Sequence, residues 1–139
     1  MAASWSRGLC LLLAGCSAGD PTASDPALVF EDGFTNAPSE VTVLAEGGTI
    51  VRGFDAWLKL QQQQTAIEAR QHDDYVYRDC AAPLAWFSEV TGDPGLQADA
   101  PGMVCEERVD PRFEFDNGRW LVTDRQRGLV YYRIWKHYP

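Results

Sequence analysis

Long apolar runs, histidines and positive charge are scarce in this chain, and each shortage excludes a class of protein. The apolar segment near its N-terminus, residues 8–13, falls far below the roughly 18 residues that a membrane-spanning helix needs. There are only two histidines, and no glycine-rich segment has the context of a phosphate-binding loop. The net charge of −8 argues against binding to nucleic acid and against electrostatic adhesion to anionic lipid headgroups. The sequence also contains no internal repeat.

What the N-terminus does contain is a short leader that ends in Leu13-Ala14-Gly15-Cys16. This tetrapeptide resembles the lipobox of bacterial lipoproteins at all four positions. The resemblance implies cleavage before Cys16, a diacylglycerol thioether on its sulfur and an acyl chain such as palmitate on the new amine. It also implies a place in the cell envelope, on the periplasmic face of the outer membrane in a Gram-negative cell, because Ser17 is not aspartate. An ordinary secretory signal or a buried N-terminal helix are the alternatives.

The leader sets the expected domain organisation. Residues 1–15 are predicted to be the signal peptide, and residues 16–26 the lipidated N-terminus with a polar, proline-bearing tether. A tether of about ten residues reaches on the order of 16–19 Å as a flexible coil. Residues 27–139 form a single globular domain, in which we recognise no named family.

Two cysteines remain for the domain once Cys10 is removed with the leader and Cys16 carries the lipid. Cys80 and Cys105 are therefore expected to form a disulfide, the default in an oxidising envelope. Closing a loop of about 26 residues stabilises a fold by roughly 3–4 kcal/mol in the chain-entropy model. We expect no metal site here, because neither thiol has a partner at zinc-ligand spacing. No cofactor is expected.

The residue pattern predicts an α+β fold: an antiparallel sheet of about five strands packed against one or two helices. Asp25-Pro26 begins a helix that ends near residue 34. Residues 41–60 form a hairpin in which Trp57 shares the polar face of its strand, so that face is expected to be covered. A second helix is predicted over residues 62–73, on the capping-box spacing of Thr65 and Glu68.

The C-terminal half predicts one more helix and a meander. Leu84, Phe87 and Val90 follow a helical spacing behind Pro83, and the remainder of the segment to Met103 lacks a periodic pattern. A three-stranded meander is predicted over residues 112–136, with a tight turn at Asn117-Gly118 and a long last strand. Residues 108–139 carry seven basic and four acidic residues, and we expect their arginines to face solvent.

Few residues suggest chemistry. His72-Asp73-Asp74 is the single histidine–carboxylate cluster, and we expect His72 to interact with the end of the predicted helix. Glu106-Glu107 could form a carboxylate pair, but neighbours on a strand point to opposite faces. The chain is therefore predicted not to be an enzyme.

Trp86 and Phe87 are the best candidates for contact with a partner, because they lie in the segment that the disulfide closes. The expected function is that of a small envelope lipoprotein that binds an envelope protein as an accessory, adaptor or inhibitor module. Alternatives are a carrier of a small apolar or glycan ligand, favoured by Trp57 on a covered face, and an envelope enzyme.

Overall fold

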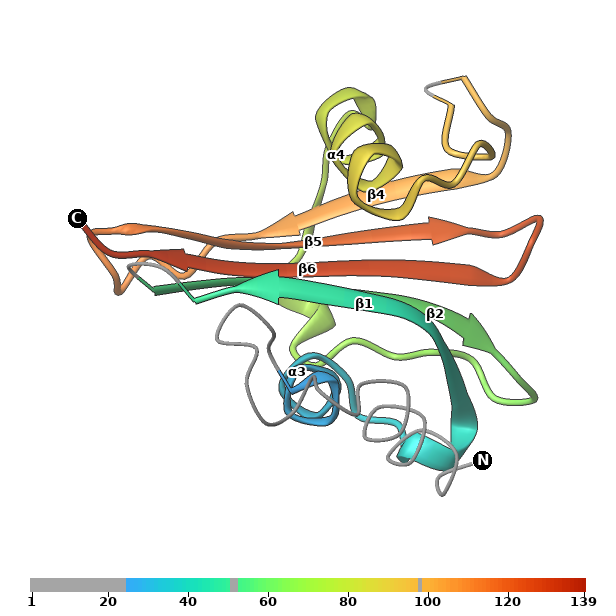
Figure 1. Cartoon of the computed structure of the whole chain (residues 1–139), viewed down its shortest axis with the longest axis horizontal. Coiled ribbons are helices and arrows are strands. Elements are labelled where there is room, and N and C mark those ends of the chain that lie inside the picture. The colour runs from blue at the N-terminus through green and yellow to red at the C-terminus, as the bar shows by residue number, and fades with distance from the viewer. Residues whose placement is uncertain (1–24, 51–52, 98) are drawn as a thin grey trace.

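The computed structural model describes residues 25–50, 53–97 and 99–139 and consists of one antiparallel sheet with a helix on each face (Figure 1). Its six strands have the order β1-β2-β6-β5-β4-β3, which confirms the α+β class with one strand more than expected. The strands are β1 (Val41–Thr49), β2 (Gly53–Gln62), β3 (Val76–Tyr77), β4 (Met103–Arg108), β5 (Asp116–Asp124) and β6 (Leu129–His137). The lipobox and Cys16 lie outside the described residues.

The helices lie on opposite faces of this sheet, which we name the α3 face and the α4 face (Figure 1). Within the described ranges the helical elements are α3 (Pro26–Gly33), η1 (Pro38–Glu40), η2 (His72–Asp74) and α4 (Ala81–Thr91). No helix in the described ranges has the length and apolarity needed to cross a bilayer.

The hairpin of β1 and β2 forms as the alternation predicts, and β6 pairs with the other side of β2. Ala56, Leu58 and Leu60 of β2 are fully buried on the α3 face. Trp57 packs on the α4 face, as its place on the polar side of the strand predicted. Alternate side chains of β6 pack into the core clusters on the two faces of the sheet, which explains its near-continuous burial.

Helix α3 begins where the sequence predicts. The Asp25 carboxylate accepts a hydrogen bond from the backbone N–H of Ala27 at 2.9 Å, and Pro26 occupies the first turn. Phe30 and, just beyond the helix, Phe34 are buried, and the Phe34 ring meets the Tyr132 ring edge to face at 5.0 Å. This contact fixes α3 on the middle of the sheet.

The helix predicted over residues 62–73 is wrong. After β2 the chain crosses the α3 face in an irregular conformation and contains only the single turn η2. Its backbone pairs instead with the segment after α3: Phe34 bridges Ala69, and the Arg70 N–H donates to the Gly33 carbonyl at 2.9 Å. Tertiary pairing of the backbone here outweighs the helix propensity of the glutamines.

The predicted turn at Asn117-Gly118 is also wrong. Both residues lie at the start of β5, and the connection to the preceding strand spans residues 109–115. The Asn117 side chain closes that connection by donating to the carbonyls of Asp110 and Phe115 at 3.2 and 3.1 Å. The meander therefore begins at β4 rather than at residue 112.

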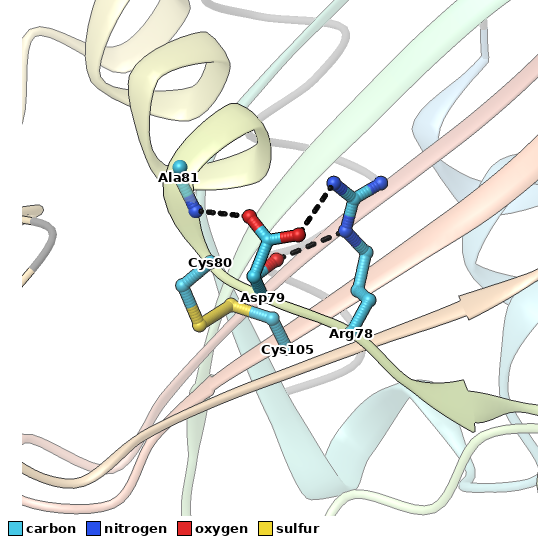
Figure 2. Close-up of a disulfide and its surroundings, with 5 residues drawn as sticks. All are labelled: Arg78, Asp79, Cys80, Ala81 and Cys105. Carbon is cyan, nitrogen blue, oxygen red and sulfur yellow. Dashed lines mark hydrogen bonds and ion pairs between the residues drawn. A yellow bond between two sulfur atoms is a disulfide. The ribbon is translucent and has the colours of Figure 1, made fainter.

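Helix α4 and the disulfide form as predicted. Cys80 immediately precedes the helix and is bonded to Cys105 of β4, with a Cα–Cα distance of 5.4 Å (Figure 2). The Asp79 carboxylate accepts from the backbone N–H of Ala81 at 3.1 Å and so caps the first turn. Gly92 ends the helix in the left-handed conformation, with φ of 68°.

Candidate functional site

The four tryptophans of the described residues gather on the α4 face. Trp57 and Trp120 lie directly opposite Arg133 on the strands that flank β6, and Trp135 follows two residues along β6. Trp86 joins them from α4: its ring meets that of Trp120 at 6.2 Å, and Trp120 meets Trp135 at 5.2 Å, both edge to face. We name these four tryptophans and Arg133 the tryptophan face.

Arg133 is the centre of this arrangement. Its guanidinium carbon lies 4.1 Å from the ring centroid of Trp86, 4.4 Å from that of Trp135 and 4.8 Å from that of Trp120. The guanidinium also donates two hydrogen bonds to Asp55, at 2.9 and 2.6 Å. This bidentate ion pair and the cation–π contacts hold the rings in one geometry.

The expectation that the C-terminal arginines face solvent is therefore wrong for two of them. The side chain of Arg133 is 11% exposed, and that of Arg119 is 12% exposed. Arg119 lies on the α3 face, where it donates to Asp32 at 3.0 Å and to the Tyr132 hydroxyl at 3.1 Å. Each guanidinium is largely removed from water and is compensated by a carboxylate.

Two glycines let the indoles lie close to neighbouring strands. A Cβ atom at Gly118 of β5 would lie 2.4 Å from Cζ2 of Trp135, and one at Gly47 of β1 would lie 2.6 Å from Nε1 of Trp57. Any larger residue at either position would push the ring off the sheet. Sequence analysis did not predict these contacts, because they depend on the register of each strand pair, which places Gly47 opposite Trp57 and Gly118 opposite Trp135.

A second set of polar contacts supports the rim of the face. The Asp116 carboxylate accepts from the indole N–H of Trp135 at 3.0 Å and contacts the His137 ring at 3.0 Å. These hydrogen bonds, the indole bond first, lower the pKa of Asp116 below its ordinary value. The other ring nitrogen of His137 lies 3.3 Å from Asp55, so one chain of contacts links Asp116 to Arg133.

The two predicted contact residues have different environments. Trp86 is half-buried at the edge of α4, whereas Phe87 is fully buried and packs against Tyr131 with ring centroids 5.5 Å apart. Phe87 also meets the Trp86 ring edge to face at 5.1 Å. Trp86 thus keeps an accessible surface, and Phe87 supports it from the core.

Beyond α4, a buried polar cluster fastens the helix layer to the sheet. Asp93 accepts from Lys59 at 2.9 Å, from Arg127 at 3.2 Å and from the Tyr131 hydroxyl. Burial alone would raise the pKa of Asp93, but the hydrogen bonds from Tyr131, Arg127 and Lys59 outweigh it and hold that pKa well below its usual range.

The α3 face carries a separate pocket of about 420 Å³. Glu106 is buried in its wall, and its Oε2 lies 2.8 Å from Nε2 of His72. The pocket is lined by a mixture of polar and apolar residues: Thr35, Ile67, Glu68, Ala69, His72, Glu106, Leu121 and Thr123.

Among the sequence candidates, the structure thus brings together His72 and Glu106, two residues far apart along the chain. The expected contact of His72 with a helix end is wrong, because no helix precedes it. Glu106 and Glu107 point to opposite faces as expected, and Glu107 pairs with Arg78 at 3.0 Å. Within the described ranges, no group of three or more histidine, cysteine or acidic residues is arranged to hold a metal ion.

Comparison of the chain with protein-family models, with curated proteins and with solved structures finds no match. The geometry of the tryptophan face and of the His72–Glu106 pocket is therefore the basis for inference about function.

Proposed function

We propose that this chain is a small, non-enzymatic envelope lipoprotein that binds another envelope protein through the tryptophan face. In this proposal Cys16 carries the lipid, and the domain acts as an accessory subunit, an adaptor or an inhibitor. Because of the lipobox resemblance, we propose that the protein lies on the periplasmic face of the outer membrane in a Gram-negative cell. Neither nucleic acid nor a cofactor has a role in this function.

The observation that carries the proposal is the convergence of four tryptophans around Arg133. Tryptophan and arginine are the residue types that most often dominate the binding energy of protein interfaces. Three of the rings, those of Trp57, Trp86 and Trp120, are half-buried, so each presents part of its surface to a partner. The remainder of each ring is held by neighbouring strands, by α4 or by Arg133.

Preorganisation strengthens this argument. Because Asp55 and the stacked rings already fix Arg133, a partner would not have to order flexible side chains when it binds. The positive charge at the centre is also compensated within the face. A partner can therefore bury the indoles without leaving an unpaired arginine in the interface.

A site-directed crosslink tests the proposal. We expect a benzoylphenylalanine at position 86 to crosslink one discrete envelope protein in intact cells. The same residue at position 77 is the matched control, because Tyr77 is an exposed aromatic residue away from the face, with 77% of its surface accessible. Equal crosslinking at the two positions, or none at position 86 in a folded protein, would contradict the proposal.

An alanine substitution measures how much Trp86 contributes to the affinity for the partner. Trp86→Ala should weaken capture of the crosslinked partner by about 30-fold or more, the loss typical of a tryptophan at the centre of an interface. Tyr77→Ala should leave capture unchanged. Phe87 is not a useful test residue, because its truncation would open a cavity in the core.

The pocket on the α3 face favours a second candidate, the carrier of a small ligand. Among the described contacts of Glu106, the hydrogen bond from His72 involves Oε2 alone, which leaves Oε1 as an acceptor in the pocket wall. Glu68 adds a second carboxylate to the lining. These groups suit a compact molecule with an ammonium group, such as an amino sugar.

Nuclear magnetic resonance titration separates this candidate from the first. Glucosamine should shift the signals of Thr35, His72 and Thr123, whereas N-acetylglucosamine, which lacks the charge, should not. Glu106→Gln should abolish the shifts, and Glu114→Gln at an exposed position should preserve them. Identical responses to the two sugars would exclude an ammonium site.

A further inference from the structure

One end of the sheet carries four of the eight large apolar side chains that are exposed within the described ranges: Leu28, Ile50, Phe113 and Tyr138. At this end β2 begins and β6 ends, and Phe113, Phe115 and Tyr138 form a contiguous aromatic group with centroid distances of 4.9 and 4.8 Å. Phe113 is 37% exposed and Tyr138 is 47% exposed. These three rings are the first part of a surface that we name the sheet-end surface.

The second part of the sheet-end surface is an apolar groove beside α3. The groove has a volume of about 360 Å³, and Leu28, Ile50 and Phe54 contribute to its lining. Leu28 is 64% exposed and Ile50 is 53% exposed. The groove and the aromatic group are continuous, because the ammonium of Lys136 lies 5.8 Å from the Phe54 ring and 5.2 Å from the Phe113 ring.

The opposite end of the sheet has a contrasting character. Its exposed residues include glutamines 61–64, at the end of β2 and just beyond it, and residues 125–127 in the turn between β5 and β6. None of the large apolar residues found exposed within the described ranges lies in these two segments. The molecule therefore has one apolar end and one polar end, about 27 Å apart for a nine-residue strand.

The chain enters the domain at the apolar end. Asp25, the first described residue, lines the groove beside Leu28. Nine residue steps separate it from Cys16, and nine steps span at most about 30–32 Å when fully extended. A lipid on Cys16 thus keeps the sheet-end surface close to the bilayer, whereas the polar end could face the bilayer only with the connection almost fully stretched.

We propose that the sheet-end surface rests on the bilayer and that its apolar side chains enter the interfacial layer. This inference depends on the proposed lipid anchor and adds the orientation of the domain. Tyrosine is enriched at membrane interfaces. The charged groups of Lys136 and Arg112 lie 5.2 and 5.8 Å from the centre of the Phe113 ring, and long side chains of this kind can extend from there toward the headgroups. Because the chain is acidic, anionic headgroups do not attract it as a whole. We therefore expect the contact to come from apolar side chains and not to depend on anionic lipid.

Paramagnetic broadening measures this orientation directly. The lipoprotein is placed in phosphatidylcholine nanodiscs in which some lipids carry a nitroxide on the acyl chain. We expect the amide signals of residues 112–115 and of Tyr138 to lose at least about threefold more intensity than those of residues 125–127. Adding phosphatidylglycerol should not change the pattern.

Paired variants test the residues themselves. Phe113→Ser with Tyr138→Ser should remove the broadening while the protein stays attached through its lipid. Leu44→Ser with Val76→Ser is the matched control, because both residues are exposed and apolar but lie away from the sheet end. Stronger broadening at residues 125–127, or none at either end of an attached protein, would overturn the orientation.

The failure of the anchor itself has a different signature. If the proposed anchor is wrong, the mass of the N-terminal peptide from the purified protein will show no lipid on Cys16. In that case Cys16 is coupled to a maleimide lipid in a Cys10→Ser chain, and the same broadening experiment is repeated. The broadening pattern of this coupled protein then tests the orientation by itself, although the proposal that the protein is a natural lipoprotein would already be refuted.

Discussion

Substitution of Asp93 by asparagine should cost this protein a large share of its stability. The carboxylate is 4% exposed and accepts from Lys59 of β2, from Arg127 in the turn between β5 and β6, and from Tyr131 of β6. Removing one partner of a buried ion pair typically costs 3–5 kcal/mol. Lys59 and Arg127 remain 19% and 39% exposed and can be partly rehydrated, so we expect a loss of about 2–4 kcal/mol.

Urea denaturation followed by tryptophan fluorescence measures this loss. Asp99→Asn is the matched control, since Asp99 is an exposed aspartate six positions later in the same connection. The control should change the free energy of unfolding by less than about 0.5 kcal/mol. A cost below about 1 kcal/mol for Asp93→Asn, or one equal to that of the control, would refute the role assigned to the buried cluster.

The pH dependence gives an independent check on the same residue. A carboxyl group whose pKa is lowered by folding contributes stability above its unfolded pKa of about 3.9 and loses it as the pH falls. The pKa of Asp93 is lowered in the fold. The difference in unfolding free energy between the wild type and Asp93→Asn should therefore be largest near neutral pH and shrink below about pH 4.

Three further predictions concern single features of the fold. The double substitution Cys80→Ser with Cys105→Ala should lower the free energy of unfolding by about 3.5 kcal/mol, the value that the chain-entropy model gives for a loop of this length. Urea titration without reductant measures this loss. Gly118→Ala should cost about 1–3 kcal/mol and shift the emission of Trp135, because its Cβ would lie 2.4 Å from that ring; unchanged emission would contradict the close contact. Tyr75→Phe should stabilise the protein by about 1 kcal/mol in thermal unfolding, since the Tyr75 hydroxyl is buried and unpaired among the described residues.

The elements that sequence analysis predicted correctly are those with strong local signals. Asp25-Pro26 is an N-cap followed by a proline, and α3 begins there. The alternation along residues 54–60 predicted both the strand and the side of it on which Trp57 lies. In each case the signal lies within a few residues of the element that it specifies.

The wrong predictions have a common physical origin in contacts between distant segments. Residues 63–71 contain good helix formers, but their backbone groups pair with the chain after Phe34, which propensity cannot reveal. Asn117-Gly118 has the composition of a tight turn, yet Gly118 is required for the packing of Trp135. A residue suited to two roles can be assigned only when its neighbour in space is known.

The candidate site shows the same limit. Trp86 was selected from the sequence, but the role of Arg133 could not be, because it depends on the register that places Trp57 and Trp120 on either side of it. The proximity of His72 and Glu106 likewise arises from the path of residues 63–75 across the sheet. The spacing of residues along the chain therefore predicts neither the position of Arg133 among the tryptophans nor the contact between His72 and Glu106.

The sheet divides the apolar interior into two clusters that do not share a residue, one under α3 and one under α4. The α4 layer is joined to the sheet at one end by the disulfide at Cys80 and at the other end by Asp93. We therefore expect the two layers to exchange amide hydrogens at different rates, with opening of the α4 layer leaving the α3 layer intact. We expect reduction of the disulfide to loosen the start of α4 and to leave its end fastened at Asp93, so opening of the α4 layer, and with it the exposure of Trp86, would begin at the Cys80 side.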